Sequence, residues 1–228
     1  IDELPPGRTP VNTLIVSNER RGEVVERIAA ACENRSQAYW VCTLIDESEV
    51  LQCQAAEVTA QQLAEQLPQV RVGLVHGRMK PVEKAEVMAR FKAAEIDLLV
   101  ATTVIEVGVD VPNSSLMVIE NPERLGLAQL HQLRGRVGRG SIKSHCILLY
   151  QSPLSRNGKE RLGVMRESND GFYIAEKDLE LRGPGQVLGT AQTGLMEFRI
   201  ADLVRDAAML DDVKDAADHV LGHHPQVV

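Results

Sequence analysis

The sequence predicts an α/β fold built on one parallel sheet with helices on both faces. Short apolar runs recur along much of the 228-residue chain, and they are continuous rather than alternating with polar residues. Such runs are typical of strands that are covered on both faces. Between them lie stretches whose apolar residues recur at helical spacing. Strands that alternate with helices favour parallel pairing through right-handed crossovers.

The first predicted elements follow a linker over residues 1–10, which is rich in proline. The apolar run 11–17 predicts a strand, and the helical spacing of apolar residues over 21–34 predicts an amphipathic helix. The continuous apolar run 38–45 predicts a second strand. The acidic stretch 46–56 shows no clear period, so we expect it to form a loop.

The following residues repeat the same rhythm. A helix is predicted over 58–67, where Pro68 ends it. Another is predicted over 82–94, beside Pro81, whose missing N–H is harmless in the first turn of a helix. Further apolar runs predict strands at 70–75, 96–101, 115–120 and 144–150.

The pattern changes after residue 152, which predicts a sheet domain over 11–152 and a helical appendage over 153–228. The Asn-Asp-Gly turn at 169–171 divides the start of the appendage into a helical hairpin. The remaining predicted elements are the two hairpin helices, a glycine-bearing loop and a last amphipathic helix, at 154–168, 172–181, 186–194 and 200–221.

Bulk composition excludes several classes of protein. The longest apolar runs are too short to span a membrane, and no signal-peptide pattern opens the chain. The four cysteines form no CxxC pair and match no zinc spacing, so we expect reduced thiols in a cytosolic protein and no metal site. Because the first residue is Ile1, we expect the chain to begin inside a longer protein.

The net charge of −7 does not suggest a nucleic-acid partner, so a polyanion would need a local basic surface. Two groups of basic residues could supply one. The first group is Arg134, Arg136, Arg139 and Lys143, and the second is Arg71, Arg78, Lys80 and Lys84.

The segment 129–140 organises the functional prediction. If it is helical, Gln132, Arg136 and Arg139 share one face, because they are spaced by four and three residues. Guanidinium groups are planar and permanently charged, so they suit phosphate oxygens. Gly135 would let another surface come close. The alternative interpretation is a solvated basic helix face.

This segment resembles the last conserved motif of superfamily 2 helicases, Gln-x-x-Gly-Arg-x-x-Arg. The resemblance implies that Arg136 and Arg139 are arginine fingers for ATP, with Gln132 beside them as a catalytic residue and Gly135 at the nucleotide. Arginine fingers stabilise the charge that builds on the transferring phosphoryl group.

Residues 102–112 resemble the fifth motif of the same superfamily. The resemblance implies that Gly108 and Asp110 bind the nucleotide and that Thr102 or Thr103 contacts a nucleic-acid phosphate. Hydroxyl and backbone N–H groups donate to phosphate, and a carboxylate accepts from sugar hydroxyls. Glu106 is either a coupling residue or a surface charge. The alternative is a strand followed by a loop that an aspartate caps.

Residues 72–79 resemble the fourth motif, in which the end of a strand meets the nucleic-acid backbone. The resemblance implies that His76, Gly77 and Arg78 bind nucleic acid. The alternative is a turn with an exposed arginine. Because parallel sheets bind ligands beyond the carboxyl ends of their strands, we expect all three motif segments to lie there or on the following helix.

Residues 178–194 resemble the translocation motif that the RecG and Mfd families share. By this resemblance Arg182 and Gln192 couple ATP hydrolysis to movement on double-stranded DNA. A packing hairpin with a glycine-rich surface loop is the alternative.

Together these stretches identify the chain as a member of the RecG family of ATP-dependent DNA helicases. The resemblance implies a RecA-like second motor domain of the P-loop NTPase fold, followed by the translocation hairpin. The sequence holds no G-x-x-x-x-G-K-[ST] loop and no acidic Walker B box. ATP and Mg²⁺ are therefore expected to bind mainly to a first motor domain upstream. A DNA-opening wedge domain is expected to lie upstream as well.

The implied partners are double-stranded and branched DNA, such as stalled forks and Holliday junctions, and the upstream domains of the same protein. Single-stranded DNA-binding protein is a further candidate partner, no membrane partner is expected, and the implied location is the bacterial cytoplasm at the nucleoid. Two alternatives stay open: an Mfd-type transcription-repair translocase, and a motor-like scaffold without activity. The fragment alone is expected to be inactive.

Overall fold

The computed structural model describes residues 9–43, 49–102, 111–140, 142–182, 209, 212–216 and 219, with the backbone alone at 49 and 182. The chain divides into two compact units, Ile1–Ala175 and Glu176–Val228. Nearly all the described structure belongs to the first unit, and the following paragraphs concern that unit.

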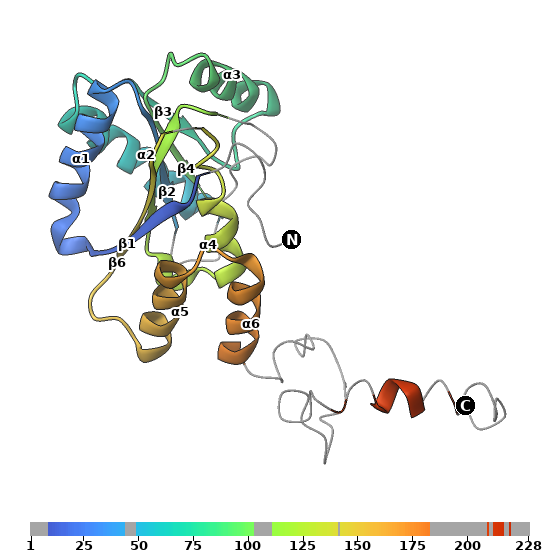
Figure 1. The fold of residues 1–228 in the computed structure, drawn as a ribbon. Coiled ribbons are helices and arrows are strands. Elements are labelled where there is room, and N and C mark those ends of the chain that lie inside the picture. The colour runs from blue at the N-terminus through green and yellow to red at the C-terminus, as the bar shows by residue number, and fades with distance from the viewer. Residues whose placement is uncertain are drawn as a thin grey trace. The chain divides into compact units, whose positions relative to one another are not determined.

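Six parallel strands form one sheet in the order β1-β6-β5-β2-β4-β3 (Figure 1). The prediction of a parallel sheet is therefore confirmed. The strands are β1 (Val11–Ser17), β2 (Gln37–Cys42), β3 (Val72–Val75), β4 (Leu98–Thr102), β5 (Ser114–Glu120) and β6 (Ser144–Tyr150).

Helices cover both faces of this sheet, as predicted (Figure 1). The α-helices are α1 (Arg21–Glu33), α2 (Glu49–Gln66), α3 (Pro81–Lys92), α4 (Leu127–Arg134), α5 (Arg156–Glu167) and α6 (Gly171–Arg182). Two short 3-10 helices, η1 (Asn18–Arg20) and η2 (Pro122–Arg124), precede α1 and α4. Because α6 crosses the boundary between the two units, it is considered only up to Ala175 below.

Alternate residues of the central strands face opposite cores. Ala38, Trp40 and Cys42 of β2 belong to the core under α1 and α2. Tyr39 points the other way, where its ring meets Phe91 of α3 edge-on at 4.9 Å between centroids. Both sets are buried, which explains why the strands read as continuous apolar runs rather than as alternating ones.

The predicted loop over 46–56 was wrong for residues 49–56, which form the start of α2. Cys53, Ala56 and Leu63 are buried along this helix. Two of these buried residues are small, and they stand among polar neighbours, so the helical period was hard to see in the sequence.

The first compact unit extends to Ala175, beyond the predicted domain boundary at residue 152. It does so because α5 lies against β1, α4 and η2. The division into a linker, a sheet domain over 11–152 and an appendage stays a prediction. Most of the predicted loop 186–194 and last helix 200–221 lies outside the described residues.

Candidate functional site

The helix that carries Gln132 ends earlier than the sequence suggested. α4 stops at Arg134, and Gly135 is its C-cap. Arg136 and Arg139 therefore lie on the loop that follows, and the predicted single helical face was wrong. Gly138 has a φ of +79°, a left-handed conformation that cannot continue an α-helix.

Glycine is required in this loop by close approach of the chain to the sheet. A Cβ at Gly138 would lie 2.8 Å from Val11 Cγ2 and 3.0 Å from the Thr9 carbonyl oxygen. A Cβ at Gly140 would lie 2.7 Å from the Pro112 carbonyl oxygen. Thr9 N also donates to Gly138 O at 3.2 Å. These contacts hold the loop against the amino-terminal ends of β1 and β5.

The three predicted catalytic side chains are not buried in the interior of the first unit. Gln132 is exposed, and Arg136 and Arg139 are half-buried. Arg139 Nε donates to Gly135 O at 3.3 Å, so this side chain folds back on the end of α4. Within the part of the chain that the structure describes, the Arg136 guanidinium has no hydrogen-bond or ion-pair partner. No described residue therefore competes with an anion for this group.

The other predicted motifs lie at the opposite edge of the sheet. β3 and β4 are parallel neighbours, and His76 and Thr102 stand at their carboxyl-terminal ends. The expectation that all three motifs gather beyond the carboxyl ends of the strands or on the following helix was therefore wrong for the arginine loop. Residues 135–140 lie at the amino-terminal edge, because α4 runs back along the sheet before β6 begins.

At the carboxyl-terminal edge, Arg78 is exposed, and the backbone of Gly77 is fixed by a hydrogen bond from α3. Lys84 Nζ donates to the Gly77 carbonyl oxygen at 2.8 Å. His76 Nε2 lies 3.4 Å from Glu57 Oε1 of α2, while its buried Nδ1 has no hydrogen-bond partner among the described atoms. The turn therefore presents Arg78 outward on a fixed base.

Thr102 does not present its hydroxyl to a partner, because only 2% of the residue is exposed. Of the two predicted threonines, Thr103 is then the remaining candidate for a phosphate contact. Thr103, Glu106, Gly108, Asp110 and Gln192 lie outside the described residues, as does the side chain of Arg182. Thr102 and Val111, which flank the first of these gaps, lie at opposite edges of the sheet.

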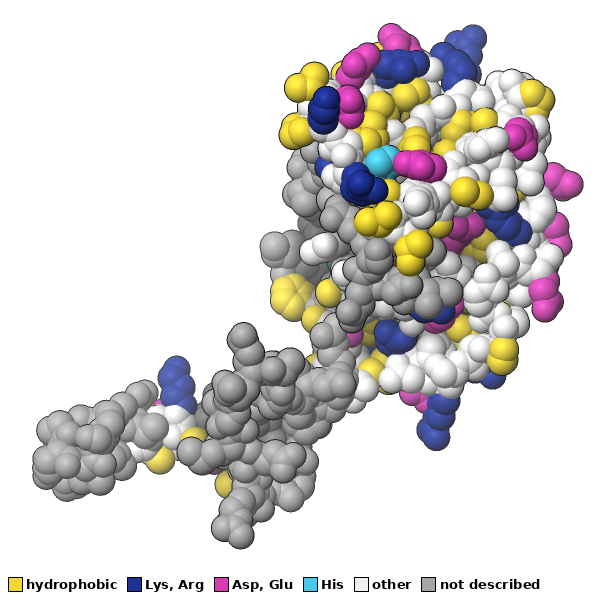
Figure 2. Space-filling model, turned by 180° about the vertical axis from the view of Figure 1, so that it is seen from behind, with side chains coloured by type: hydrophobic (Ala, Val, Ile, Leu, Met, Phe, Trp, Pro, Cys, Tyr) yellow, Lys and Arg dark blue, Asp and Glu magenta, His cyan; other side chains and the backbone are white. Residues whose placement is uncertain are grey.

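The predicted basic surfaces are smaller in the structure than in the sequence. Arg134 is 2% exposed and belongs to the interior. Arg71 forms an ion pair with Asp97 at 2.6 Å, which lowers the pKa of that carboxyl group through the hydrogen bond from the guanidinium. Figure 2 shows basic, acidic and hydrophobic side chains intermixed on the described part of one face. On this face, the described basic side chains do not form a broad patch.

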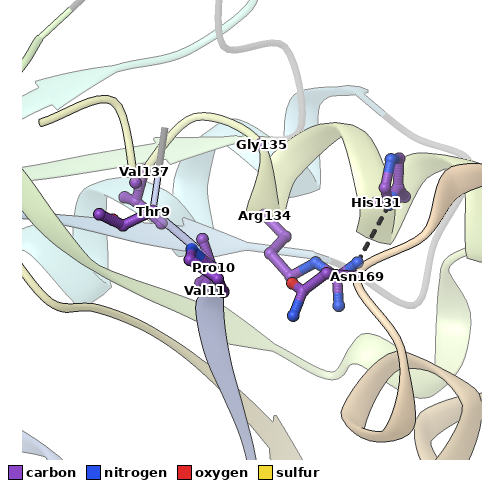
Figure 3. A pocket seen from close by; sticks show the side chains of 9 residues that line it. Thr9, Pro10, Val11, His131, Arg134, Gly135, Val137 and Asn169 are labelled. Atoms are coloured by element: carbon purple, nitrogen blue, oxygen red, sulfur yellow. Dashed lines mark hydrogen bonds between the residues drawn. The ribbon is translucent and has the colours of Figure 1, made fainter. Parts of the chain in front are cut away.

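Arg134 is the functional-site residue that the sequence misassigned. Its Nη1 donates to the carbonyl oxygens of Met165 and Ser168 at 2.7 and 2.8 Å, and it lies 3.3 Å from Thr13 Oγ1. Its Nη2 donates to His131 Nδ1 at 3.1 Å. Figure 3 shows the side chain turned toward His131 and Asn169. Burial lowers the pKa of this guanidinium.

A second arginine was missed altogether. Arg161 of α5 donates to the carbonyl oxygens of Glu123 and Leu125 at 2.6 and 3.0 Å. Residues 123 and 125 directly precede α4. The sequence offered no signal for this contact, because an arginine on an amphipathic helix is usually solvated.

The cavity beside Arg134 is too small for a nucleotide. It measures about 60 Å³ and lies among residues 9–11, the end of α4 and Asn169 (Figure 3). Cofactor sites are usually several hundred cubic ångströms. The described residues hold no cluster of three or more His, Cys, Asp or Glu side chains that could bind a metal. Among them, no helix has both the length and the apolar character needed to cross a bilayer.

The family model described as "Helicase conserved C-terminal domain" matches residues 17–141, which is more than half of the chain. The chain belongs to this helicase family. A second model, "ATP-dependent DNA helicase RecG, domain 3, C-terminal", matches residues 168–228. The first match covers the strands β2 to β5 and nearly the whole arginine loop, and the second covers α6 and the residues beyond it.

Individual relatives confirm the predicted resemblance to RecG. The chain is 64% identical to ATP-dependent DNA helicase RecG of Escherichia coli O157:H7, over 99% of this chain and 33% of that protein. It is 63% identical to the protein of the same name from Pasteurella multocida, over 100% of this chain and 33% of the relative. The chain thus spans about a third of the length of these curated relatives.

Solved structures give the same result. A structure of RecG bound to a three-way DNA junction matches 92% of this chain and 27% of that chain, with 44% identity and a TM-score of 0.72. Domain 2 of the DEAD-box helicase Mss116p, bound to an RNA duplex, matches 75% of this chain and 69% of that chain. Its identity is 17% and its TM-score is 0.55, so it supports the fold alone. The predicted RecA-like helicase lobe is confirmed.

Proposed function

We propose that this chain is the second motor domain of an ATP-dependent translocase that remodels branched double-stranded DNA. The observation that carries the proposal is the placement of Arg136. Its guanidinium is half-buried at one edge of the sheet, on a loop fixed by glycine contacts, and it has no partner among the described residues. A guanidinium donates to phosphate oxygens, so a phosphate group bound on a separate lobe is a ligand that suits Arg136.

The residues present suit one side of an ATP site. Arg136 and Arg139 would donate to phosphate oxygens, Gln132 would orient the reacting group, and Gly135 would allow a close approach. Gly108 would bring the protein backbone close to the nucleotide, and the Asp110 carboxylate would accept from the ribose hydroxyls. ATP would supply the phosphoryl group that is transferred. Mg²⁺ would be held by the first motor domain upstream. The arginines stabilise the charge that develops on the transferring phosphoryl group.

The opposite edge of the sheet would follow the DNA. Arg78 is exposed above a turn that Lys84 supports, and Gly77 lets a sugar-phosphate backbone come close. Thr103 would add a donor there, whereas the His76 ring faces Glu57 and would support the turn. Because phosphate contacts read no bases, this edge would bind without sequence preference, as a translocase requires. Glu106, Arg182 and Gln192 would couple the two edges to movement.

The relatives support the substrate class. The similar proteins are named ATP-dependent DNA helicase RecG, and one is solved on a three-way DNA junction. We accordingly propose stalled forks and Holliday junctions as substrates, a bacterial cytoplasmic location near the nucleoid, upstream motor and wedge domains, and single-stranded DNA-binding protein as a further partner.

The test is Arg136→Ala in the full-length protein. We expect the rate constant of DNA-stimulated ATP hydrolysis to fall by about 10³-fold or more, on the scale known for arginine fingers. Binding to a model fork should change little, because Arg136 lies at the other edge of the sheet. Arg156→Ala is the control: this residue lies on α5, and its side chain is 93% exposed.

Each alternative predicts a different outcome. A motor-like scaffold predicts that branched DNA does not stimulate ATP hydrolysis and that Arg136→Ala changes nothing. An Mfd-type translocase predicts a polymerase-interacting module in the upstream sequence, where the proposed function predicts a wedge-type DNA-binding domain. Hydrolysis by the variant at the wild-type rate would contradict the role of Arg136.

A further inference from the structure

Arg134 is an unusual residue for the place it occupies. It is the last residue of α4, it is almost wholly buried, and no carboxylate among the described residues pairs with it. A buried charge without a counter-ion costs stability, and an apolar residue of similar size could fill the space more favourably. The contacts of the guanidinium therefore need explanation, because they use several donors of one cationic group.

Those contacts are the free carbonyl groups at the end of a different helix. Met165 lies in the last turn of α5, and Ser168 is the C-cap of the same helix. The last four carbonyls of an α-helix have no partner within the helix, and they carry the negative end of its dipole. Arg134 Nη1 donates to both oxygens at 2.8 Å or less. The end of α4 thus caps the end of α5.

The same residue is continuous with the arginine loop. Gly135 follows it directly, Val137 N donates to Arg134 O at 3.2 Å, and Arg139 Nε donates to Gly135 O. The two nucleotide-facing arginines are therefore connected to the backbone of Arg134 through one or two residues.

α5 is attached to the α4 segment at a second point. Arg161, in the middle of α5, donates to carbonyl oxygens at residues 123 and 125, just before α4 begins. Arg134 makes the corresponding contact where both helices end. The two contacts fix the position and the direction of α5 relative to α4. A movement of α4 would therefore move α5 as well. Ser168 leads into the turn before α6, and a Cβ at Gly171 would lie 3.3 Å from His131 Nε2.

We propose that Arg134 is a positioning residue that couples the nucleotide-facing arginine loop to the turn between α5 and α6. It touches neither nucleotide nor DNA. Its role is to make the start of the hairpin move with the loop that carries Arg136 and Arg139. This inference rests on the proposed function, because coupling has a meaning only in a motor that hydrolyses ATP and moves.

The test measures hydrolysis and movement separately in the full-length protein. Arg134→Gln removes the charge, and Arg134→Lys keeps the charge but not the fork of donors. The readouts are the DNA-stimulated ATPase rate constant, the KM for ATP, and the base pairs moved per ATP, measured by triplex displacement. We expect Arg134→Gln to lower the base pairs moved per ATP by about tenfold or more, while the ATPase rate constant falls by less than about threefold. Arg134→Lys should restore part of the ratio.

Thr13→Val is the matched control. It removes the longest of the Arg134 contacts, at 3.3 Å, and leaves the two carbonyl contacts with α5 in place. Its base pairs moved per ATP should equal those of the wild type. An equal loss in Thr13→Val would overturn the proposal, because it would assign the effect to packing on β1.

The outcomes are distinguishable. If Arg134→Gln loses hydrolysis and movement in the same proportion, Arg134 has a structural role and the coupling inference is wrong. If Arg134→Gln does not fold, Arg134→Lys decides, through hydrogen exchange of the amides at 168–174 with and without a non-hydrolysable ATP analogue. Protection in the wild type should change with the analogue, and this change should be smaller in Arg134→Lys; a change as large as in the wild type would overturn the inference. If the wild type shows no DNA-stimulated ATPase, the proposed function itself fails, and the inference fails with it.

Discussion

At the scale of single residues, three neighbouring arginines of one short segment have three different environments. Arg134 is buried on carbonyl oxygens, Arg139 folds back on the end of α4, and Arg136 stays without a described partner. Their spacing in the sequence could not distinguish them, because it was interpreted on a helix that ends at Arg134. The direction of each side chain depends on the turn of the chain after α4, in which Gly138 has a left-handed conformation.

Gly138 gives a prediction about stability at this scale. Gly138→Ala would place a Cβ at positive φ and 2.8 Å from a Val11 methyl group, so the free energy of unfolding should fall by about 1–3 kcal/mol. Calorimetric unfolding measures the change.

Gly163→Ala is the control for this substitution. Gly163 lies within α5, and its added Cβ would meet nothing closer than 3.9 Å. Alanine should therefore raise stability by up to about 1 kcal/mol through helix propensity. Equal effects of the two substitutions would contradict the account of the loop.

Arg78 gives a prediction about binding. Its exposed guanidinium should contact one phosphate, so Arg78→Ala should weaken binding to a model fork. The slope of log K against log salt concentration should become shallower by about 1. A fluorescence titration at several salt concentrations measures both. An unchanged slope would remove Arg78 from the proposed interface.

At the scale of elements, the ends of helices and strands decide where chemistry is possible. α3 begins with Pro81 beside the turn that carries Arg78, and α4 ends beside the loop that carries Arg136. The sequence predicted both helices. Its bounds for α3, 82–94, lie within two residues of the observed ones, whereas α4 ends at Arg134, well inside the segment 129–140 that was interpreted as helical. The boundaries of a helix depend on contacts such as those of Gly138 with residues 9 and 11, which are far from it in the sequence.

The connection before β4 gives a prediction about pH. Arg71 donates from its side chain and its backbone N to Asp97, and this pairing lowers the pKa of the carboxyl group below its ordinary value of 3.8. A lowered pKa contributes stability that is present above the ordinary value and is lost as the pH falls through the lower, folded value. Asp97→Asn should therefore cost about 1 kcal/mol near neutral pH, since Arg71 is largely exposed.

The difference in unfolding free energy between wild type and Asp97→Asn should stay constant from about pH 5 upward and narrow below about pH 4. Thermal unfolding over this pH range measures it. Glu23→Gln breaks the exposed pair with Arg20 and should change stability little at any pH. A difference that widens in acid would contradict the sign of the argument.

At the scale of the molecule, the sheet separates two edges with different proposed tasks. The arginine loop lies at the amino-terminal edge, and the turn at 76–78 lies at the carboxyl-terminal edge. A lobe that binds phosphate at one edge and DNA at the other can link the two through its rigid sheet. Neither edge holds a complete ATP site within the described residues.

This incompleteness predicts the behaviour of the isolated chain. We expect negligible ATP hydrolysis, because the chain lacks a phosphate-binding loop, and weak DNA binding that declines as salt rises. A coupled-enzyme ATPase assay and a DNA titration measure these properties. Robust hydrolysis by the chain alone would contradict the proposal of an upstream motor domain.

The sequence by itself determined the class of fold, the strands Val11–Ser17 and Ser144–Tyr150, and the motifs that relate the chain to helicases. These features depend on local periodicity or on residue identity, which the sequence records directly. Only the tertiary structure decided that Arg134 is buried, that Thr102 is hidden, and that the motifs lie at two edges. Such facts depend on contacts between distant segments, and no local pattern specifies which of three adjacent arginines meets the end of another helix.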